Sequence, residues 1–136
     1  MRLTTRHHFS AAHRLDTPAL TPEENRRLYG KCNNPFGHGH DYTVDVTIEG
    51  TLGDDGQVAN RSALDTLVKT AVIARLDHKN LNADLPEFAT AVPTTENLAT
   101  VIRESLQREW TLAARLVRVR ISETDRNTFV WEAPPQ

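Results

Sequence analysis

The chain has 136 residues, of which 38% are hydrophobic and 25% charged, and its 16 basic and 18 acidic side chains give a formal net charge of −2. At this length we expect one domain over residues 1–136, and the near-neutral charge argues against nucleic acid as a partner. No apolar run is long enough to span a membrane or to act as a signal peptide, and a single cysteine excludes an intramolecular disulfide, which favours a cytoplasmic protein.

The first half of the chain alternates between apolar and polar residues in two stretches. Residues 1–9 predict a first strand that leads into small residues before His13, and residues 40–49 predict a second strand with one buried face. Between them, a Thr-Pro pair predicts the start of a short helix over residues 23–28. After a Gly-rich turn, residues 57–59 are expected to extend a hairpin.

Two stripes of apolar residues at helical spacing follow. The first helix is expected to begin after Asn60 or Ser62 and to end before a polar loop at residues 76–82. The second is expected to begin after Thr94 or Thr95. Both stripes have the spacing of ordinary core faces, so neither indicates a cofactor site.

Two further strands are predicted at residues 117–121 and 129–131. The order strand, strand, helix, helix, strand, strand predicts an α+β domain whose antiparallel sheet has its helices on one face. Glu123 falls on the apolar parity of its strand. Its side chain therefore lies either in solvent at the end of the strand or in a pocket. The opposite sheet face would be polar, as suits solvent or the wet interior of an oligomer. Its residues are Thr43, Asp45, Thr47, Arg118 and Arg120.

Residues 30–42 concentrate side chains that can do chemistry. They contain the only cysteine, Cys32, and two of the six histidines, in a loop shaped by proline and glycine. His38 and His40 share the parity of the buried strand face, so their imidazoles can converge on one metal ion such as zinc. Taken alone, such a pair is more often two ordinary histidines, and a lone cysteine is more often a small buried residue. Their crowding into one loop favours a functional site.

Six short blocks, spread from the first strand to the last, carry a family resemblance. They are FSAAH at residues 9–13, the EN to GKCNNP segment at residues 24–35, GHGH at 37–40, LDHKNL at 76–81, TTENL at 94–98 and ETD at 123–125. Together they resemble the 6-pyruvoyltetrahydropterin synthase family, which includes the 6-carboxytetrahydropterin synthases of the queuosine pathway. The block from Cys32 to His40 is more similar to the 6-pyruvoyl branch than to the 6-carboxy branch.

The resemblance implies the tunnelling fold (T-fold), a four-stranded antiparallel sheet with two helices on one face. In that fold the sheets of three subunits join around a tunnel, and two trimers usually stack. We therefore expect a homo-oligomer, either a trimer or a dimer of trimers, with active sites at the subunit interfaces. The resemblance further implies a Zn²⁺ ion in each site and 7,8-dihydroneopterin triphosphate as the small-molecule substrate.

The same resemblance implies roles for nine residues. The zinc ligands would be His13, His38 and His40. The proton-transfer set would be Cys32, Asp77 and His78. The residues that bind the pterin ring would be Glu123, Thr94 and Thr95.

The chemistry of these residue types suits that assignment. Three imidazoles leave one open position on tetrahedral zinc, where substrate hydroxyls can bind and become more acidic. A thiol of lowered pKa and an Asp-His pair can move the protons that the reaction requires. A carboxylate such as Glu123 can accept two parallel hydrogen bonds from the amino edge of a pterin. The triphosphate requires cations, and the sequence offers several without favouring one: Arg14, Lys31, Lys79, Arg118 and Arg120.

Three functions remain open at this point. The first is a zinc-dependent lyase that forms 6-pyruvoyltetrahydropterin and releases triphosphate. The second is an enzyme with the same substrate and site that forms 6-carboxytetrahydropterin. The third is a non-catalytic module that binds zinc or a pterin, although binding alone has no need of Cys32, Asp77 and His78.

Overall fold

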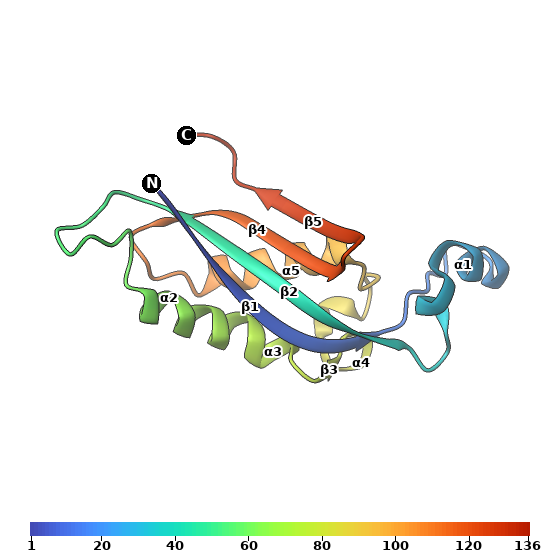
Figure 1. Ribbon diagram of the computed structural model, residues 1–136. Coiled ribbons are helices and arrows are strands. Elements are labelled where there is room, and N and C mark those ends of the chain that lie inside the picture. The colour runs from blue at the N-terminus through green and yellow to red at the C-terminus, as the bar shows by residue number, and fades with distance from the viewer.

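The computed structural model describes residues 1–136, and two long strands form the spine of the molecule (Figure 1). β1 (Arg2–His13) and β2 (His38–Glu49) pair antiparallel over their whole length. The register runs from Arg2 opposite Glu49 to His13 opposite His38. β4 (Arg115–Thr124) pairs with the other side of β2, and β5 (Asn127–Glu132) pairs with β4, both antiparallel.

A fifth strand corrects the expected count of four. β3 (Lys79–Asn80) pairs parallel with β1 at Ala11 and Ala12, which gives the strand order β3-β1-β2-β4-β5. Two residues are too few for an alternating pattern, so the sequence shows no strand here. The expected polar loop at residues 76–82 thus holds β3 together with the start of α4 (Leu81–Asp84).

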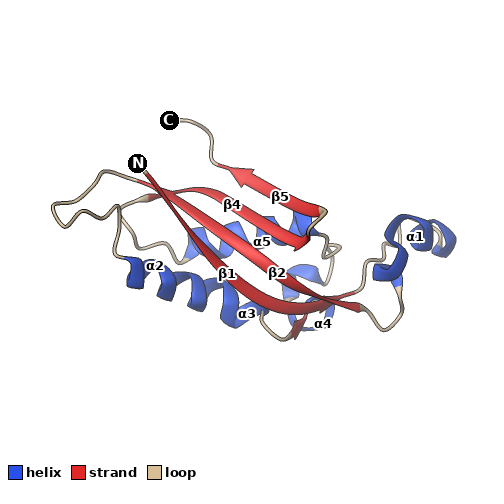
Figure 2. Cartoon of the chain, viewed as in Figure 1, coloured by secondary structure: helices blue, strands red, loops and turns tan.

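The main helices lie together on one face of the sheet (Figure 2). The first runs through α2 (Arg61–Val68), a π-helical turn (Lys69–Ile73) and α3 (Ala74–Leu76), and the second is α5 (Thr95–Arg108). Asn60 caps the first helix and Thr94 the second, each side chain accepting a backbone N–H, as the sequence predicts. None of the helices is both long and apolar enough to cross a bilayer.

The core lies between these helices and the sheet. The alternating residues of β2 point into it as expected, and burying one such side chain stabilises the fold by about 1.5–3 kcal/mol. Fully buried side chains come from β2, the helices and β4, and include Val44, Val46, Ile48, Leu64, Val68, Leu98, Ile102, Val119 and Ile121.

The opposite sheet face is less exposed than expected. Thr47 is buried and shares a hydrogen bond of 2.8 Å with Thr4. Asp45 is also buried, because Arg6 donates to its two carboxylate oxygens at 2.7 and 3.0 Å and Arg120 donates at 3.3 Å. The long arginine side chains cover the carboxylate that they bind. Sequence parity assigns a residue to a face but does not show which neighbours will cover it.

Two connections extend beyond opposite ends of the β1–β2 ribbon. The expected hairpin at residues 57–59 is wrong, because this segment forms a loop closed by the Gly53 N–H donating to the Gln57 carbonyl at 2.8 Å. At the other end, α1 (Pro22–Tyr29) and a 3₁₀ turn (Gly30–Asn33) stand beyond the ends of β1 and β2 (Figure 1). The connection between α4 and α5 contains a further 3₁₀ turn, Pro86–Phe88.

The Asp45 cluster gives a prediction about stability in acid. Hydrogen bonds from Arg6 lower the pKa of Asp45, so its contribution is present above the unfolded pKa of about 3.9 and is lost as the pH falls through the lower folded value. We expect Asp45→Asn to cost about 1 kcal/mol of unfolding free energy at pH 7, because the arginines are partly exposed. In urea titrations this difference should shrink below about pH 4; a difference that is constant down to the acid transition would contradict the assignment.

Candidate metal centre

Three histidines meet where β1 ends and β2 begins. His13 lies directly opposite His38 in the register, and Ala11 lies opposite His40. Directly opposed residues of antiparallel strands project from the same face, and His40 shares the parity of His38. The pairing therefore carries all three imidazoles to one side of the ribbon. His13 is fully buried, His40 is half-buried and His38 is exposed.

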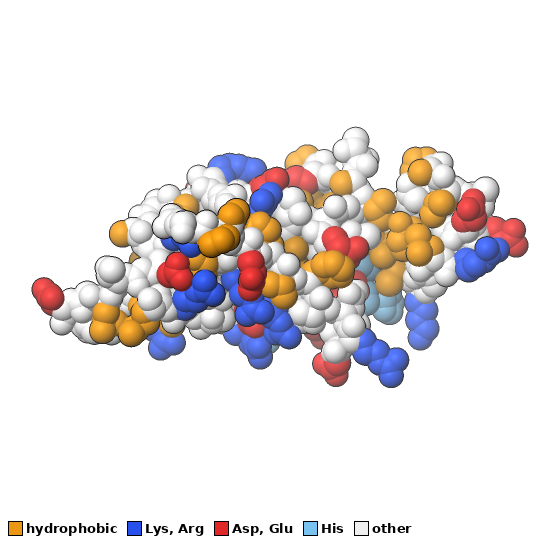
Figure 3. Space-filling model, turned by 90° about the horizontal axis from the view of Figure 1, so that it is seen from above, with side chains coloured by type: hydrophobic (Ala, Val, Ile, Leu, Met, Phe, Trp, Pro, Cys, Tyr) orange, Lys and Arg blue, Asp and Glu red, His pale blue; other side chains and the backbone are white.

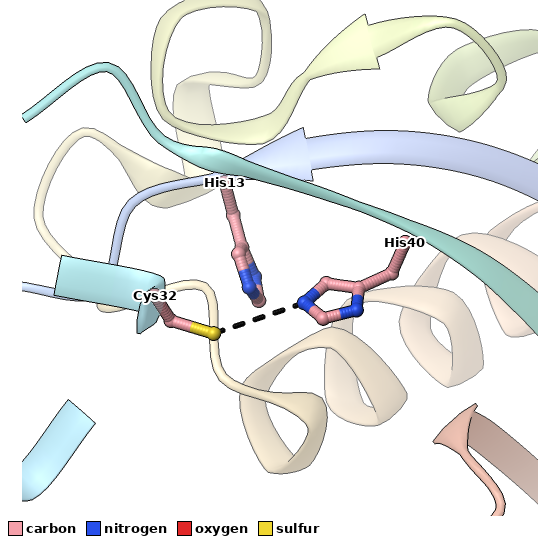
Figure 4. A group of neighbouring side chains, drawn as sticks. All are labelled: His13, Cys32 and His40. Atoms are coloured by element: carbon pink, nitrogen blue, oxygen red, sulfur yellow. Dashed lines mark hydrogen bonds between the residues drawn. The ribbon is translucent and has the colours of Figure 1, made fainter. Parts of the chain in front are cut away.

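A separate segment brings Cys32 to this point. After β1 the chain passes through α1 and returns in the 3₁₀ turn that contains the cysteine. The Cys32 Sγ lies 3.7 Å from His40 Nε2, and the potential ligand atoms of His13, Cys32 and His40 lie within 4.8 Å of one another (Figure 4). The His38 ring lies outside this set, with its centroid 4.6 Å from that of His40.

Buried amides hold the segment that carries Cys32. The Leu15 N–H donates to the Cys32 carbonyl at 2.7 Å, and Asn33 Nδ2 donates to the Leu15 carbonyl at 2.7 Å. Further along, Asn25 exchanges two hydrogen bonds of 2.9 Å with the backbone of Thr17. The sequence reasoning missed both asparagines as positioning residues. Their occurrence within the family-like segment at residues 24–35 was the available signal.

Gly37 is required where the returning chain passes β1. Its φ is +81°, and a Cβ at this position would lie 3.0 Å from the His13 carbonyl oxygen. A larger residue would meet both the strain of positive φ and this close approach. The glycine therefore allows the loop before β2 to lie against the end of β1.

His13 is held with one nitrogen facing the site. Its Nδ1 lies 2.9 Å from the Pro93 carbonyl oxygen, which can only accept, so Nδ1 carries the proton and Nε2 presents its lone pair. Nε2 is buried without a hydrogen-bond partner. A backbone acceptor that fixes the tautomer in this way is the usual support for a metal-binding histidine. Every residue has a backbone carbonyl, so the residue type at position 93 does not predict this role for Pro93.

Glu123 faces the same point from β4. Its Oε1 lies 3.3 Å from His13 Nε2 and 3.2 Å from His40 Nε2. Burial lowers the pKa of both histidines, which favours neutral rings. A neutral His13 then turns its lone pair toward a carboxylate oxygen, an arrangement that a cation among these atoms would satisfy. The nitrogen and sulfur donors are those that zinc prefers, so the residues present fit such an ion.

The environment of Cys32 leads to the same conclusion. Burial raises the pKa of the thiol, and the nearby Glu123 carboxylate raises it further. Without a positive charge the sulfur therefore keeps its proton at neutral pH. A bound cation would favour the thiolate, which is the nucleophilic and basic form.

Asn127 connects Glu123 to α5. Its Nδ2 donates to Glu123 Oε2 at 2.7 Å and to Thr95 Oγ1 at 3.2 Å, and Tyr42 donates to Glu123 Oε1 at 3.4 Å. The structure thus links Glu123 and Thr95 through one shared partner, Asn127. The Thr94 side chain instead accepts the Asn97 N–H as the cap of α5. Asn127 and Tyr42 are absent from the residues singled out in the sequence.

Asp77 and His78 form a pair at a different place. His78 Nε2 lies 3.4 Å from Asp77 Oδ2, and Ser10 holds the pair by donating its N–H to Asp77 Oδ1 at 2.9 Å and accepting the His78 N–H at 2.7 Å. The His78 side chain is 82% exposed, and its φ is +60°, which few residues adopt. The pair makes no hydrogen bond or ion pair with Cys32 of the same chain, although His78 and His40 line one pocket with Ser10.

Comparisons with known proteins extend the likeness over nearly the whole chain. The family pattern described as 6-pyruvoyl tetrahydropterin synthase matches residues 2–134. A human 6-pyruvoyl tetrahydrobiopterin synthase is 46% identical over 125 residues, which are 91% of this chain and 86% of the human protein. A Bacillus subtilis 6-carboxy-5,6,7,8-tetrahydropterin synthase is 36% identical over 132 residues, which are 93% of this chain and 75% of that protein. The solved structure of Caenorhabditis elegans 6-pyruvoyl tetrahydropterin synthase has a TM-score of 0.89 at 33% identity, covering 98% of this chain and 96% of that one.

The geometry predicts one divalent ion per chain at this centre. We expect His40→Ala to lower the bound zinc or cobalt sharply, because His40 is central to the set of donors. His8→Ala is the matched control, since His8 is exposed and lies on the other parity of β1. Metal content by atomic emission after dialysis measures the effect. Equal metal in His40→Ala and His8→Ala would place the ion elsewhere.

Proposed function

The chain belongs to the 6-pyruvoyl tetrahydropterin synthase family, and from this premise we propose that it is a lyase acting on 7,8-dihydroneopterin triphosphate. The proposed reaction releases triphosphate and leaves 6-pyruvoyltetrahydropterin. Its α+β architecture is the tunnelling fold, with β3 added at the sheet edge. The observation that carries the proposal is the convergence of two imidazoles, a thiol and a carboxylate at one end of the β1–β2 ribbon.

In the proposed site His13, His38 and His40 would hold Zn²⁺. Supporting this choice, His38 is the cross-strand partner of His13, and its exposed ring beside His40 is free to turn toward the other two. Three nitrogen ligands leave Cys32 near the ion without occupying a ligand position. Bound there, zinc would supply positive charge that stabilises an oxyanion on the substrate side chain.

The other residues bind the pterin ring or take a proton from the substrate side chain. Glu123 binds the amino edge of the pterin ring, with Asn127 fixing the orientation of the carboxylate and Thr95 lying beside it. Thr94 is a weaker candidate for this role because its hydroxyl caps α5. Cys32 takes a proton from a side-chain carbon that lies next to a hydroxyl group.

Asp77 and His78 complete the proposed proton-transfer set. Asp77 orients the imidazole of His78, as in other Asp-His pairs that move protons. The exposure of His78, and the absence of a contact with Cys32, suit a pair that works at an interface with another copy of the chain. We therefore propose that the complete site forms between subunits.

The sheet supports an assembly of copies. The outer edge of β1 is paired only at Ala11 and Ala12, and β5 has no strand on its outer side. Open edges of this kind readily pair with another chain. Hydrophobic side chains also gather between the body of the molecule and the α1 end (Figure 3). Exposed large hydrophobic residues include Leu28, Phe36, Phe129 and Val130.

A second product is supported by one comparison. The Bacillus subtilis relative is named a 6-carboxy-5,6,7,8-tetrahydropterin synthase. The same residues suit this reaction, which keeps one side-chain carbon as the carboxylate and releases the other two as acetaldehyde. The identity and coverage of the human relative favour the pyruvoyl product.

Product analysis tests the proposed reaction. We expect zinc-loaded protein to convert 7,8-dihydroneopterin triphosphate to the pyruvoyl pterin and free triphosphate, identified by mass spectrometry. Cys32→Ala should lower turnover by about 10²–10⁴-fold, the usual contribution of a positioned acid or base.

The same experiment separates the alternatives. A carboxy pterin with acetaldehyde would select the second product, and unchanged substrate would select a binding module. Zinc content of Cys32→Ala is the control for the role of the thiol. Loss of zinc in that variant would make Cys32 a ligand, and full turnover would remove it from the proton-transfer set.

The open edges predict self-association on a three-fold axis. We expect sedimentation velocity at micromolar concentration to give a mass of three or six chains, since closure of the sheets removes their edges. Phe129→Glu on β5 should shift the distribution toward smaller species. A wild-type monomer under these conditions would contradict the proposed assembly.

A further inference from the structure

A basic hollow adjoins the candidate metal centre on the side of α1. It has a volume of about 460 Å³, and no hydrophobic side chain lines it. Three of its residues are cations that come from different elements: Arg14 follows β1, Arg26 lies on α1, and Lys31 lies on the 3₁₀ turn. In the space-filling view basic side chains lie beside exposed histidine atoms between the body and the α1 end (Figure 3).

Two of these cations have no partner within the chain. No carboxylate lies within 4.0 Å of Arg26 or Lys31 among the ion pairs of the structure. Arg14 is held in place, because its Nε donates to the Asn33 carbonyl at 3.3 Å and its Nη2 lies 3.7 Å from Asp16. The hollow therefore has an excess of positive charge with one guanidinium already fixed toward it.

The remaining basic candidates are engaged or lie elsewhere. Arg120 donates to Asp45, and Arg118 lies 3.4 Å from Glu132. Lys79 lines the separate pocket that contains His78. Arg26 was not among the cations considered from the sequence, since only the fold of α1 back toward Lys31 brings it to the site.

A chain of contacts links the hollow to the residue proposed to bind the pterin ring. Glu123 contacts His13 and His40, His40 contacts Cys32, and Cys32 stands between Lys31 and Asn33, which both line the hollow. In 7,8-dihydroneopterin triphosphate the side-chain hydroxyls lie between the pterin ring and the phosphates. If the ring lies at Glu123 and the hydroxyls at the histidines, a substrate that runs on past Cys32 brings its phosphates to the hollow.

We propose that Arg14, Arg26 and Lys31 form a polyphosphate subsite that binds the triphosphate of the substrate. Guanidinium and ammonium groups bind phosphate oxygens through charge-assisted hydrogen bonds. Such groups also stabilise the negative charge that the leaving triphosphate gains as its carbon–oxygen bond breaks. The identity of the ligand rests on the proposed function, but the capacity of the hollow to bind polyphosphate does not.

Inorganic tripolyphosphate is the probe that separates these two statements. Isothermal titration calorimetry is carried out on the full chain as purified, with zinc content measured before and after, because tripolyphosphate also chelates metal ions. We expect Arg26→Ala and Lys31→Ala each to weaken binding about tenfold, as for a lost hydrogen bond to a charged group. Lys31→Arg should retain binding. Arg27→Ala is the matched control, since Arg27 is an exposed arginine of α1 that does not line the hollow.

The outcomes differ for the subsite and for the reaction. Equal tripolyphosphate binding by wild type, Arg26→Ala and Lys31→Ala would overturn the subsite, even if the wild type forms the pterin product. The expected losses in both variants, with binding retained in Arg27→Ala and Lys31→Arg, would support it even if no product forms. When product does form, the subsite further requires Arg26→Ala to raise the KM for the substrate, and an unchanged KM would overturn it.

Discussion

The site depends on the register of β1 against β2. Twelve residues of each strand pair without interruption, so the position of every side chain at the end of the ribbon is fixed by the core residues along it. A shift of one residue would move Val44 and Val46 out of the core and turn the histidines to the opposite face. The burial of the apolar face of β2 therefore also determines that His13 and His38 stand opposite each other. Stability and function share one constraint here.

Electrostatics at the centre complement this geometry. The Pro93 carbonyl fixes the proton of His13 on Nδ1, and Glu123 presents an oxygen to the other nitrogen. The chain thus places acceptors against one another in a buried position, which costs free energy unless a cation lies between them. Glu123 also has its own supports in Tyr42 and Asn127. These partners favour a carboxylate held at the edge of the centre.

Much of the fold could be predicted from the sequence because its signals are local. The alternation in β2 and the cap at Thr94 depend only on neighbouring residues, and both were confirmed. The strand β3, the burial of Asp45 and the role of Asn33 depend on segments far apart in the chain, so no local pattern shows them. Parity likewise placed His38 and His40 on one face. It could not show that the sulfur of Cys32, and not the ring of His38, would lie with the donor atoms of His13 and His40.

The amides that hold the α1 segment have a consequence for its dynamics. Residues 14–37 are held together mainly by the hydrogen bonds of Asn25 and Asn33, whereas β1 and β2 are held by the apolar core. A unit with few buried apolar contacts opens at a lower free energy than the sheet beside it. The chain thus divides its chemistry between a sheet that carries the imidazoles and an arm, held by polar contacts, that carries the thiol. Local opening of this arm would expose the sulfur of Cys32 while the histidines of β1 and β2 keep their places.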